Sequence, residues 1–460
     1  MITEIQNILS FLTKEENKKP KQLISYAIKY NEINFRNLLN NLQTLGKNFF
    51  YWTHAQNEQH FCEIDNTVTI VSVDIIQSSD VLNTIGNIKD NFRNNWSSCG
   101  LTSIPFVFGA KKFLNDKKDF IWSDYSDSYW FIPKYIFLTR TGSSFLILNF
   151  FNNGSNRQSI ECLIKEATAL NSNHKSSSNN DLKITIHENE SDYLTWYSSI
   201  EQALDAISKK KFLKAVLSRQ VKIKLKNQPS LFCLMKNLLE NNPNCYIFMY
   251  KLGDSIFFGA SPETLVKISN KLIEIDALAG SIERGISKKD DEELANKLLQ
   301  SEKDLTEHKL VLKYIIDTIS NFAYEINYKS SPKIKKLGNI QHLWTPVRAK
   351  LKSNIPLFTI SNKLHPTPAV CGFPRKEALE FLNYNEKHDR GLFSGYIGWF
   401  NFQNECEFAV GIRSALIKDN YLYVFSGCGI VEGSNAADEY EESNLKMQPI
   451  LSLFENENTH

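Results

Sequence analysis

The sequence predicts a large α+β fold built on antiparallel sheets. Strand-like runs and amphipathic helices follow each other irregularly along the 460 residues, and no internal repeat is evident. The composition is that of an ordinary globular protein, with 42% hydrophobic, 23% charged and 12% aromatic residues. Such a chain can bury a large core, and its length alone would suggest two or three domains.

Charge and cysteine content exclude several classes of function. The 53 basic and 51 acidic residues leave a net charge of +2, so no overall field attracts nucleic acid or an anionic membrane. No apolar run reaches the roughly 18 residues of a membrane span, and the amino terminus lacks the features of a signal peptide. The eight cysteines show no C-x-x-C or metal spacing, which is typical of reduced thiols. We therefore expect a cytoplasmic protein with no nucleic-acid or membrane partner, and a monomer because no assembly motif is present.

The first half of the chain alternates between helical and strand-like patterns. Apolar residues at helical spacing predict that residues 1–50 are mostly helical, with a second helix near 35–45. Further patterns predict a helix at 80–98, a hairpin turn at 139–142, and strands at 49–52, 67–73, 105–108, 129–139 and 144–151. The polar tract 171–181 predicts a flexible connection, so the chain divides into 1–170, 171–181 and 182–460.

The second half of the chain has the same mixed character. Its patterns predict helices at 193–209, 230–241 and, as one long segment, 290–324. Strands are predicted at 214–225, 245–252, 255–259, 264–269, 391–401, 405–418 and 420–430. A glycine-rich turn and a helix rich in carboxylates follow the last strand.

Two ionisable residues on these strands are candidates for proton transfer. Lys214 opens a strand and shares one strand face with Val216 and Ser218. Burial there would favour the neutral amine, the form that acts as a base. Glu263 follows a proline at a strand junction, where a tight apolar turn would raise its pKa and make it an acid. The alternatives are a lysine with its ammonium at the surface and an exposed acid in a turn.

Two predicted helices each carry a pair of acids three residues apart. Asp304 and Glu307 form the first pair, and Glu439 and Glu442 form the second. At 100° per residue, Glu439, Glu442 and Lys446 fall within about 60° of one another on their helix. Two such helices facing each other could hold Mg²⁺, mostly through one carboxylate from each. The alternative is two solvated helices with a surface Glu442–Lys446 ion pair.

Several glycine-containing loops allow the backbone to approach a ligand. These are the segments 277–281, with Gly280 and Ser281, 365–374, with Ala369, 394–398, and Gly427-Cys-Gly429. His342 and Arg413 are candidate polar contacts of the same site. An arginine flanked by apolar residues on a strand usually pairs with a carboxylate, whereas a purely structural role is the alternative for His342.

The order and co-occurrence of these motifs resemble the chorismate-binding enzymes. This family includes isochorismate synthases, salicylate synthases and the large subunits of anthranilate and aminodeoxychorismate synthase. The resemblance covers about residues 193–451, and the amino-terminal half matches only in its place as the variable part of the same fold. It implies a single large fold in which antiparallel sheets pack as a sandwich flanked by helices.

The resemblance also implies roles for individual residues and Mg²⁺ as the cofactor. Lys214 matches the lysine that activates water, and Glu263 matches the acid that protonates the departing hydroxyl. Glu307 and Glu442 match the metal ligands, with Asp304 and Glu439 as water-linked neighbours. The positions that match contacts to chorismate or isochorismate are Gly280, Ser281, His342, Ala369, Arg413, Gly427, Gly429 and Lys446. Ser281 replaces the family's common threonine, a conservative departure.

A few positions distinguish among the reactions of this family. Lys214 stands where ammonia-using relatives generally have glutamine, and Ala279 where covalent-type aminodeoxychorismate synthases carry a lysine. Ala369 and Phe393 stand where salicylate synthases usually have threonine and tyrosine. The resemblance therefore implies an isomerase that converts chorismate to isochorismate, for menaquinone or siderophore biosynthesis. A salicylate synthase, an ammonia-dependent aminating enzyme and a catalytically silent binding protein are the alternatives.

Overall fold

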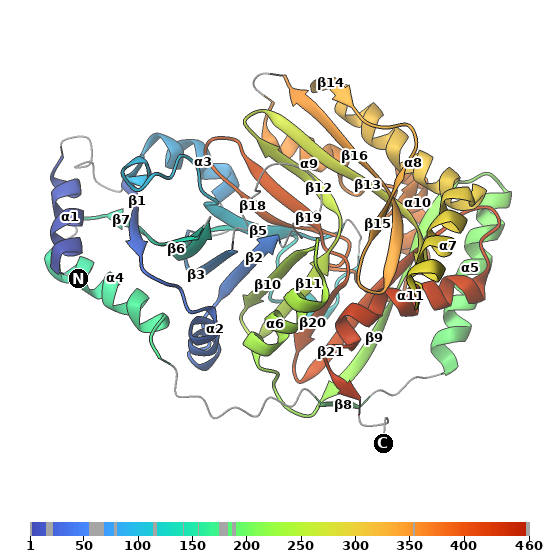
Figure 1. Ribbon diagram of the computed structural model, residues 1–460, viewed down its shortest axis with the longest axis horizontal. Coiled ribbons are helices and arrows are strands. Elements are labelled where there is room, and N and C mark those ends of the chain that lie inside the picture. The colour runs from blue at the N-terminus through green and yellow to red at the C-terminus, as the bar shows by residue number, and fades with distance from the viewer. Residues whose placement is uncertain are drawn as a thin grey trace.

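Two large, mostly antiparallel sheets pack face to face at the centre of the molecule, with helices around them (Figure 1). The computed structural model describes residues 2–14, 22–54, 69–77, 81–113, 117–140, 142–154, 156–173, 183–185, 190–352 and 355–456. This arrangement confirms the predicted α+β class and the sandwich of antiparallel sheets.

The first sheet runs from one end of the molecule to the other, and strands from both halves of the chain pair within it. Its neighbours are antiparallel except for the pairs β4–β1 and β22–β8. In spatial order its main strands are β4 (Phe92–Asn94), β1 (Gln22–Tyr30), β7 (Ser143–Asn152), β6 (Ser128–Arg140), β3 (Thr69–Gln77), β2 (Phe49–His54), β10 (Tyr246–Leu252), β11 (Ser255–Ser261), β20 (Ser414–Lys418), β21 (Tyr421–Ile430) and β9 (Lys214–Leu225). Beyond β9 lie β17 (Gly372–Phe373), β8 (Lys183–Thr185) and β22 (Glu455–Asn456).

The second sheet crosses the first and shares the long strand β6 with it. The start of β6 pairs with β5, whereas its later part pairs with β3 and β7 of the first sheet. In spatial order the other strands are β5 (Val107–Lys111), β18 (Tyr396–Phe400), β19 (Cys406–Val410), β12 (Thr264–Ser269), β13 (Leu272–Glu283) and β16 (Ile340–Leu351), with β14 (Ala323–Asn327) and β15 (Lys333–Lys336) on the far side of β16. The two sheets therefore form one continuous framework.

Three apolar clusters hold the layers together. The largest cluster joins the facing sides of the two sheets, where Phe248 and Phe257 of the first sheet meet Val266 and Phe408 of the second. The second lies under the helices on the outer face of the first sheet: α1 (Ile2–Thr13), α2 (Phe35–Thr44), α4 (Arg157–Leu170), α6 (Leu231–Asn241) and α11 (Ala436–Leu451). The third packs α5 (Glu190–Ser208) and α10 (Arg375–Asn385) against β9 and β21.

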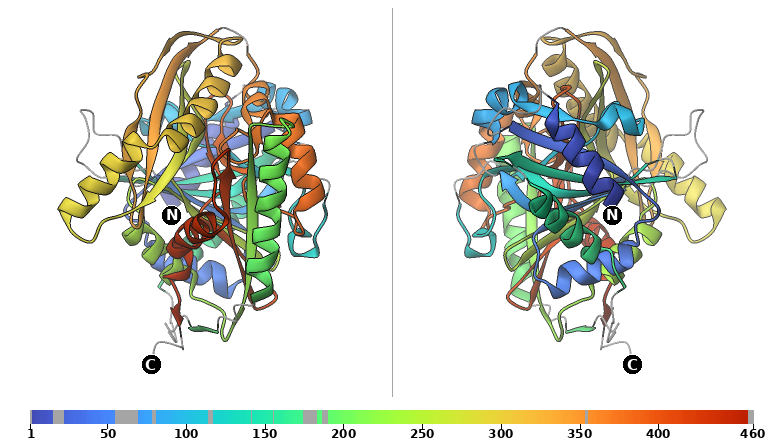
Figure 2. Two further views of the ribbon diagram at one scale, coloured as in Figure 1. Left: turned by 90° about the vertical axis from the view of Figure 1, so that its right-hand side faces the viewer. Right: turned by 90° about the vertical axis from the view of Figure 1, so that its left-hand side faces the viewer.

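The remaining helices complete the second sheet and the edges of the fold. They are α3 (Val81–Asp90), α7 (Lys288–Gln300), α8 (Glu302–Ile319), α9 (Leu357–Leu364) and the 3₁₀ turns Trp96–Cys99 and Phe120–Trp122. Figure 1 shows α7, α8 and α11 together on one side of the molecule, and the left panel of Figure 2 presents that side to the viewer. This is the side on which the acidic residues predicted to face each other lie.

Several predicted elements differ from the observed ones. The prediction of a mostly helical segment 1–50 missed β1, whose residues 22–28 are all buried, so that the strand shows no polar alternation. The predicted long helix 290–324 is two helices, because Ser301 is extended and its hydroxyl caps α8 by accepting the backbone N–H of Asp304 at 3.2 Å. The predicted helix 80–98 ends at Asp90 and is followed by β4 and a 3₁₀ turn. Most of the predicted connection 171–181 lies outside the described residues.

Among the helices of the described segments, none combines the length and the apolar character that crossing a membrane requires.

Candidate active site

Most of the predicted site residues line one small cavity of about 60 Å³ between β9, β13, β21, α8 and α11. The predicted residues at this cavity are Glu263, Gly280, Ser281, Glu307, His342, Ala369, Arg413, Gly427, Gly429, Glu442 and Lys446. Lys214 lies directly behind this lining, in contact with Glu307. Segments far apart in the sequence therefore bring one set of ionisable groups together.

Lys214 is fully buried at the start of β9, and its ammonium lies 2.7 Å from a carboxylate oxygen of Glu307. Its strand neighbours Ala215 and Leu217 point to the opposite face, into the apolar cluster under α5 and α10. The strand-face assignment is thus confirmed, and the alternative of a surface ammonium is wrong. A buried ammonium requires such a counter-ion because removing it from water is costly.

Gly429 leaves the room that this ion pair occupies. It lies opposite Val216 in the pairing of β21 with β9. A Cβ atom at Gly429 would lie 2.5 Å from Glu307 Oε1 and 2.7 Å from Lys214 Cε. The Gly-x-Gly sequence at the end of β21 is therefore explained by close packing of the site.

Glu263 lies in the junction between β11 and β12, and only 2% of its surface is exposed. Burial, reinforced by the negative charge of Asp276, raises the pKa of Glu263 to about 8. The carboxyl group is thus protonated at neutral pH and able to donate a proton. The alternative of an exposed acid in a turn is wrong.

Asp276 is held beside Glu263 by a network that the sequence did not reveal. It accepts hydrogen bonds from the Thr264 backbone N–H at 3.1 Å and from the Trp344 indole N–H at 2.6 Å. Lys335 lies 3.5 Å from Asp276 and donates to the Pro262 carbonyl oxygen at 2.5 Å. These residues lie on neighbouring strands, so only the pairing of β13, β15 and β16 brings them together.

Three carboxylates of α8 and α11 form the opposite wall, and each of the three pairs with a lysine. Glu307 pairs with Lys214 at 2.7 Å, Glu442 with Lys446 at 2.5 Å, and Glu439 with Lys303 at 2.6 Å. The i,i+4 ion pair Glu442–Lys446 of the surface alternative is present, but its two side chains are largely buried. Lys303 was missed by the sequence reasoning, because its partner Glu439 lies on another helix and no local spacing indicates the pair.

This wall has the donor chemistry that Mg²⁺ requires. Ligand atoms of Glu439, Glu442 and Cys428 lie within 4.8 Å of one another. Burial and the charge of Glu442 raise the pKa of Glu439 to about 7, even though Lys303 pairs with this carboxylate. Carboxylate oxygens are the ligands that Mg²⁺ prefers, and Glu439 and Glu442 fit this ion. The predicted ligand Glu307 is not part of this cluster and pairs with Lys214 instead. Cys428, by contrast, packs in the apolar cluster under α5.

Asp304 lies beside the wall but is engaged in the cap of α8. Its carboxylate accepts a very short hydrogen bond from the Ser301 hydroxyl, and a Cβ at Gly280 would lie 3.2 Å from its Oδ1 atom. Burial raises the pKa of Asp304.

His342 and Arg413 form a polar pair on the other side of the cavity. Arg413 Nη2 donates to His342 Nε2 at 3.0 Å, so the second ring nitrogen carries the proton and faces the Gly280 carbonyl at 3.2 Å and the Ser281 hydroxyl at 3.0 Å. Burial and the Arg413 charge hold the pKa of His342 well below its usual value. The ring is therefore neutral.

Arg413 differs from the predicted strand arginine with a carboxylate partner. The strand expected at 405–418 is broken into β19 and β20, and Arg413 lies in the turn between them with φ of 51°. Its Nε atom is buried and has no hydrogen-bond partner within the described part of the chain. A buried cationic donor without a partner that lines a cavity is suited to an anionic ligand.

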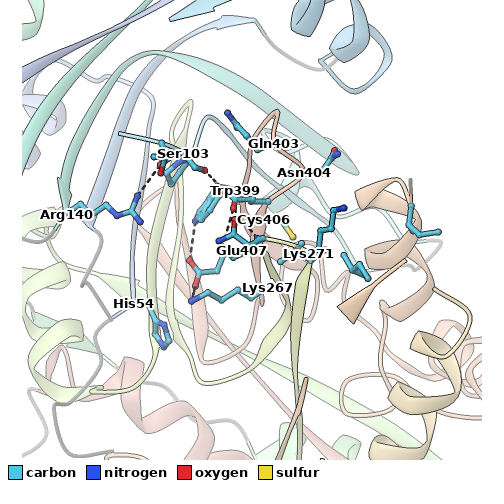
Figure 3. Close-up of a pocket in the computed structure, with 18 of the residues that line it drawn as sticks. His54, Ser103, Arg140, Lys267, Lys271, Trp399, Gln403, Asn404, Cys406 and Glu407 are labelled. Carbon is cyan, nitrogen blue, oxygen red and sulfur yellow. Dashed lines mark hydrogen bonds and ion pairs between the residues drawn. The ribbon is translucent and has the colours of Figure 1, made fainter. Parts of the chain in front are cut away.

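A larger cavity, of about 710 Å³, lies elsewhere, between the two sheets near β12 and β19 (Figure 3). None of the predicted site residues is among the described residues that line it. Its carboxylate Glu407 already has protein partners. Glu407 accepts a hydrogen bond from the Trp399 indole N–H at 3.3 Å and pairs with Lys267 at 3.5 Å. The ionisable groups therefore favour the smaller cavity as the active site.

Fold and site together define a class of enzyme in which a buried protonated acid, a buried lysine and a carboxylate wall surround one small cavity. The family profile described as "Chorismate binding enzyme" matches residues 7–455, and the chain belongs to this family.

Individual relatives support the same family. Over 413 residues the chain is 29% identical to isochorismate synthase MenF of Bacillus subtilis, covering 89% of this chain and 84% of the relative. It is 35% identical over 253 residues to the salicylate biosynthesis isochorismate synthase of Pseudomonas aeruginosa, covering 55% of this chain and 53% of the relative. That second match thus spans about half the length of the relative.

The fold matches solved structures along almost the whole chain. The menaquinone-specific isochorismate synthase MenF of Escherichia coli superposes with a TM-score of 0.79 at 23% identity, covering 99% of both chains. Anthranilate synthase component I of Streptococcus pneumoniae superposes with a TM-score of 0.63 at 20% identity, covering 96% of both chains. The expected chorismate-binding fold is confirmed.

Proposed function

We propose that this chain is an isochorismate synthase, which converts chorismate to isochorismate. The observation that carries the proposal is the pair of buried groups at one cavity, the protonated acid Glu263 and the lysine Lys214. Water attacks C2 of the ring while Lys214 acts as the base that takes the proton from the attacking water. Glu263 donates its proton to the C4 hydroxyl, which leaves as water while the double bonds shift. Each proton transfer contributes about 10²–10⁴-fold to the rate.

The other cavity residues bind and orient the dianionic substrate. Arg413, whose Nε is unpartnered among the described residues, holds the enolpyruvyl carboxylate together with nearby backbone N–H groups. Glu307 and Glu442 would hold Mg²⁺, and Asp304 and Glu439 would support it through water. When bound, Mg²⁺ supplies the positive charge that lets a substrate carboxylate approach this acidic wall.

Two residues that distinguish the family's reactions both line the cavity. Ala369 and Phe393 supply no hydroxyl there, whereas the resemblance gives salicylate synthases threonine and tyrosine at these positions. This favours release of isochorismate over further elimination of pyruvate. Lys214 in place of glutamine favours water over ammonia as the nucleophile.

Incubation of the purified protein with chorismate and Mg²⁺, followed by chromatography of the products, tests the proposal. We expect isochorismate without salicylate or pyruvate, formed without added ammonium, and lost in Lys214→Ala and Glu263→Gln. Salicylate with pyruvate, or strict dependence on ammonium, would support one of the alternative reactions. Tight chorismate binding without turnover would indicate a silent binding protein.

Some expectations from the sequence stay predictions. They are the monomeric state, the cytoplasmic location, the division into 1–170, 171–181 and 182–460, and a role in either menaquinone or siderophore synthesis. The names of the relatives include both pathways.

A further inference from the structure

A buried ion pair lies behind the candidate site and is not among its predicted residues. Arg390 is fully buried, and its guanidinium forms a bidentate pair with Glu386, with Nε donating at 2.8 Å and Nη2 through a shorter bond. The Phe113 ring covers the guanidinium with 4.4 Å between Cζ and the ring centroid. The bidentate geometry of this pair is favourable, but removing two charges from water is costly. The burial of the pair therefore needs an explanation.

The remaining hydrogen bonds of this pair connect two segments that line the cavity. Arg390 Nη2 donates to the Val216 carbonyl at 2.5 Å, and Nη1 donates to the Val370 carbonyl at 2.7 Å. Glu386 accepts the Ser218 backbone N–H at 2.9 Å and the Ser218 hydroxyl at 2.8 Å. The pair is thus hydrogen-bonded to β9 at Val216 and Ser218, two and four residues beyond Lys214. It is also hydrogen-bonded to the loop next to Ala369.

Arg390 also belongs to the third segment of this wall. Its carbonyl accepts the Phe393 backbone N–H at 2.9 Å, and Phe393 and Ser394 line the cavity. Few other bonds join β9 to the loop: the Val216 N–H donates to the Cys371 carbonyl at 2.8 Å, and β17 pairs with only the first two residues of β9. One guanidinium therefore connects all three segments.

We propose that Arg390 and Glu386 are positioning residues for the reaction, which set Lys214 relative to the substrate by fixing β9 against the 369–371 loop. This inference rests on the proposed function and extends it to residues that do not line the cavity. Four of the five guanidinium N–H groups are directed to fixed acceptors, a fork geometry that a lysine cannot reproduce. A misplacement of about 1 Å at a reacting group reduces turnover by about 10²-fold.

The test compares Arg390→Lys with the matched control Arg284→Lys. Arg284 also forms a bidentate pair, with Asp291 at 2.6 and 3.0 Å, and donates to the Leu337 carbonyl at 2.5 Å. We expect Arg390→Lys to lower kcat by about 10²-fold with KM changed less than threefold. Arg284→Lys is expected to affect melting temperature more than kcat. Equal kcat losses in the two variants, or a change in melting temperature alone, would overturn the proposal.

Two further measurements keep the proposal testable if Arg390→Lys folds poorly or if the chain does not turn over chorismate. The double variant Arg390→Gln/Glu386→Gln removes both charges, so the fold is kept while the reach to Val216 and Val370 is lost; the same fall in kcat is expected. Hydrogen exchange needs no substrate: peptides 214–219 and 369–373 should exchange faster in Arg390→Lys but not in Arg284→Lys. A wild-type protein without activity contradicts the proposed function alone, and unchanged exchange contradicts the positioning role alone.

Discussion

The ammonium of Lys214 and the carboxylate of Glu307 lie 2.7 Å apart, the former fully buried and the latter 11% exposed in its side chain. One residue is the proposed base and the other a proposed metal ligand, so a single contact couples proton transfer to the charge of the acidic wall. The contact joins β9 to α8, two elements that are far apart in the sequence.

Lys214→Met should destabilise the fold because it leaves the Glu307 carboxylate without its counter-ion. Breaking a buried pair on one side costs about 3–5 kcal/mol, and the remaining exposure of Glu307 places the expected loss at the lower end. The double variant Lys214→Met/Glu307→Gln should recover most of this stability while remaining inactive. Urea denaturation checks both values, and equal stability of the single variant and wild type would contradict the ion pair.

The pH dependence of the reaction should follow the protonation of Glu263. Its pKa of about 8 lies above the usual value for a glutamic acid, so the acid is protonated at neutral pH and loses its proton as the pH rises. We expect kcat/KM to fall above about pH 8. Measurement of kcat/KM from about pH 4 to 10 decides the point, and a fall that is already complete above about pH 5 would contradict the assignment.

Asp276→Asn should move this limb toward lower pH. The negative charge of Asp276 raises the pKa of Glu263, and its removal favours the ionised form by about one pH unit. Asparagine has one acceptor oxygen for the two N–H groups of Thr264 and Trp344, so we also expect a loss of stability of about 1–3 kcal/mol. The conservative Ser281→Thr, which retains the hydroxyl, serves as a control whose limb should not move.

Gly429→Ala should abolish most activity without unfolding the protein. The added Cβ would lie 2.5 Å from Glu307 Oε1 and 2.7 Å from Lys214 Cε, both at the ends of side chains that can shift. We expect a loss of kcat of about 10²-fold. Gly86→Ala is the matched control, because a Cβ there meets nothing within 4 Å. Near-normal turnover in Gly429→Ala would show that the spacing between Lys214 and Glu307 is unimportant for the reaction.

Direct metal binding distinguishes the carboxylates of the acidic wall. Calorimetric titration with Mg²⁺ should give an affinity at least about 10-fold weaker for Glu442→Gln than for wild type. Glu439→Gln should have a smaller effect, because the resemblance makes Glu439 a water-linked neighbour of the metal and Glu442 a direct ligand. Equal losses in the two variants would place Glu439 among the direct ligands.

The sequence predicted best where one local pattern determines the environment. The strands 214–225 and 264–269 were predicted with their observed bounds, and the strand-face argument placed Lys214 toward the cavity. Spacing of three residues within α8 and α11 likewise indicated which acids share a face. The resemblance then supplied the pairing of these two helices, which no local pattern contains.

The failures have physical reasons in long-range structure. β1 is buried on both faces, so it lacks the alternation that identifies a strand, and the break at Ser301 depends on a single cap. Asp276 and Arg390 act through partners on other strands and loops, and their sequence neighbourhoods contain no signal of those contacts. The turn conformation of Arg413 likewise depends on how β19 and β20 attach to different sheets.

The strand β6, shared by both sheets, has a consequence for how the chain folds as it is synthesised. Its neighbour β5 emerges early, as does β2, which pairs with the next strand β3, but the outer edges of β2 and β5 pair with β10 and β18, which follow much later. The early segment therefore exposes open strand edges until the second half is made, and such distant pairings slow folding. Chaperone dependence and aggregation of truncated chains that end before β10 are the expected cellular signs of this topology.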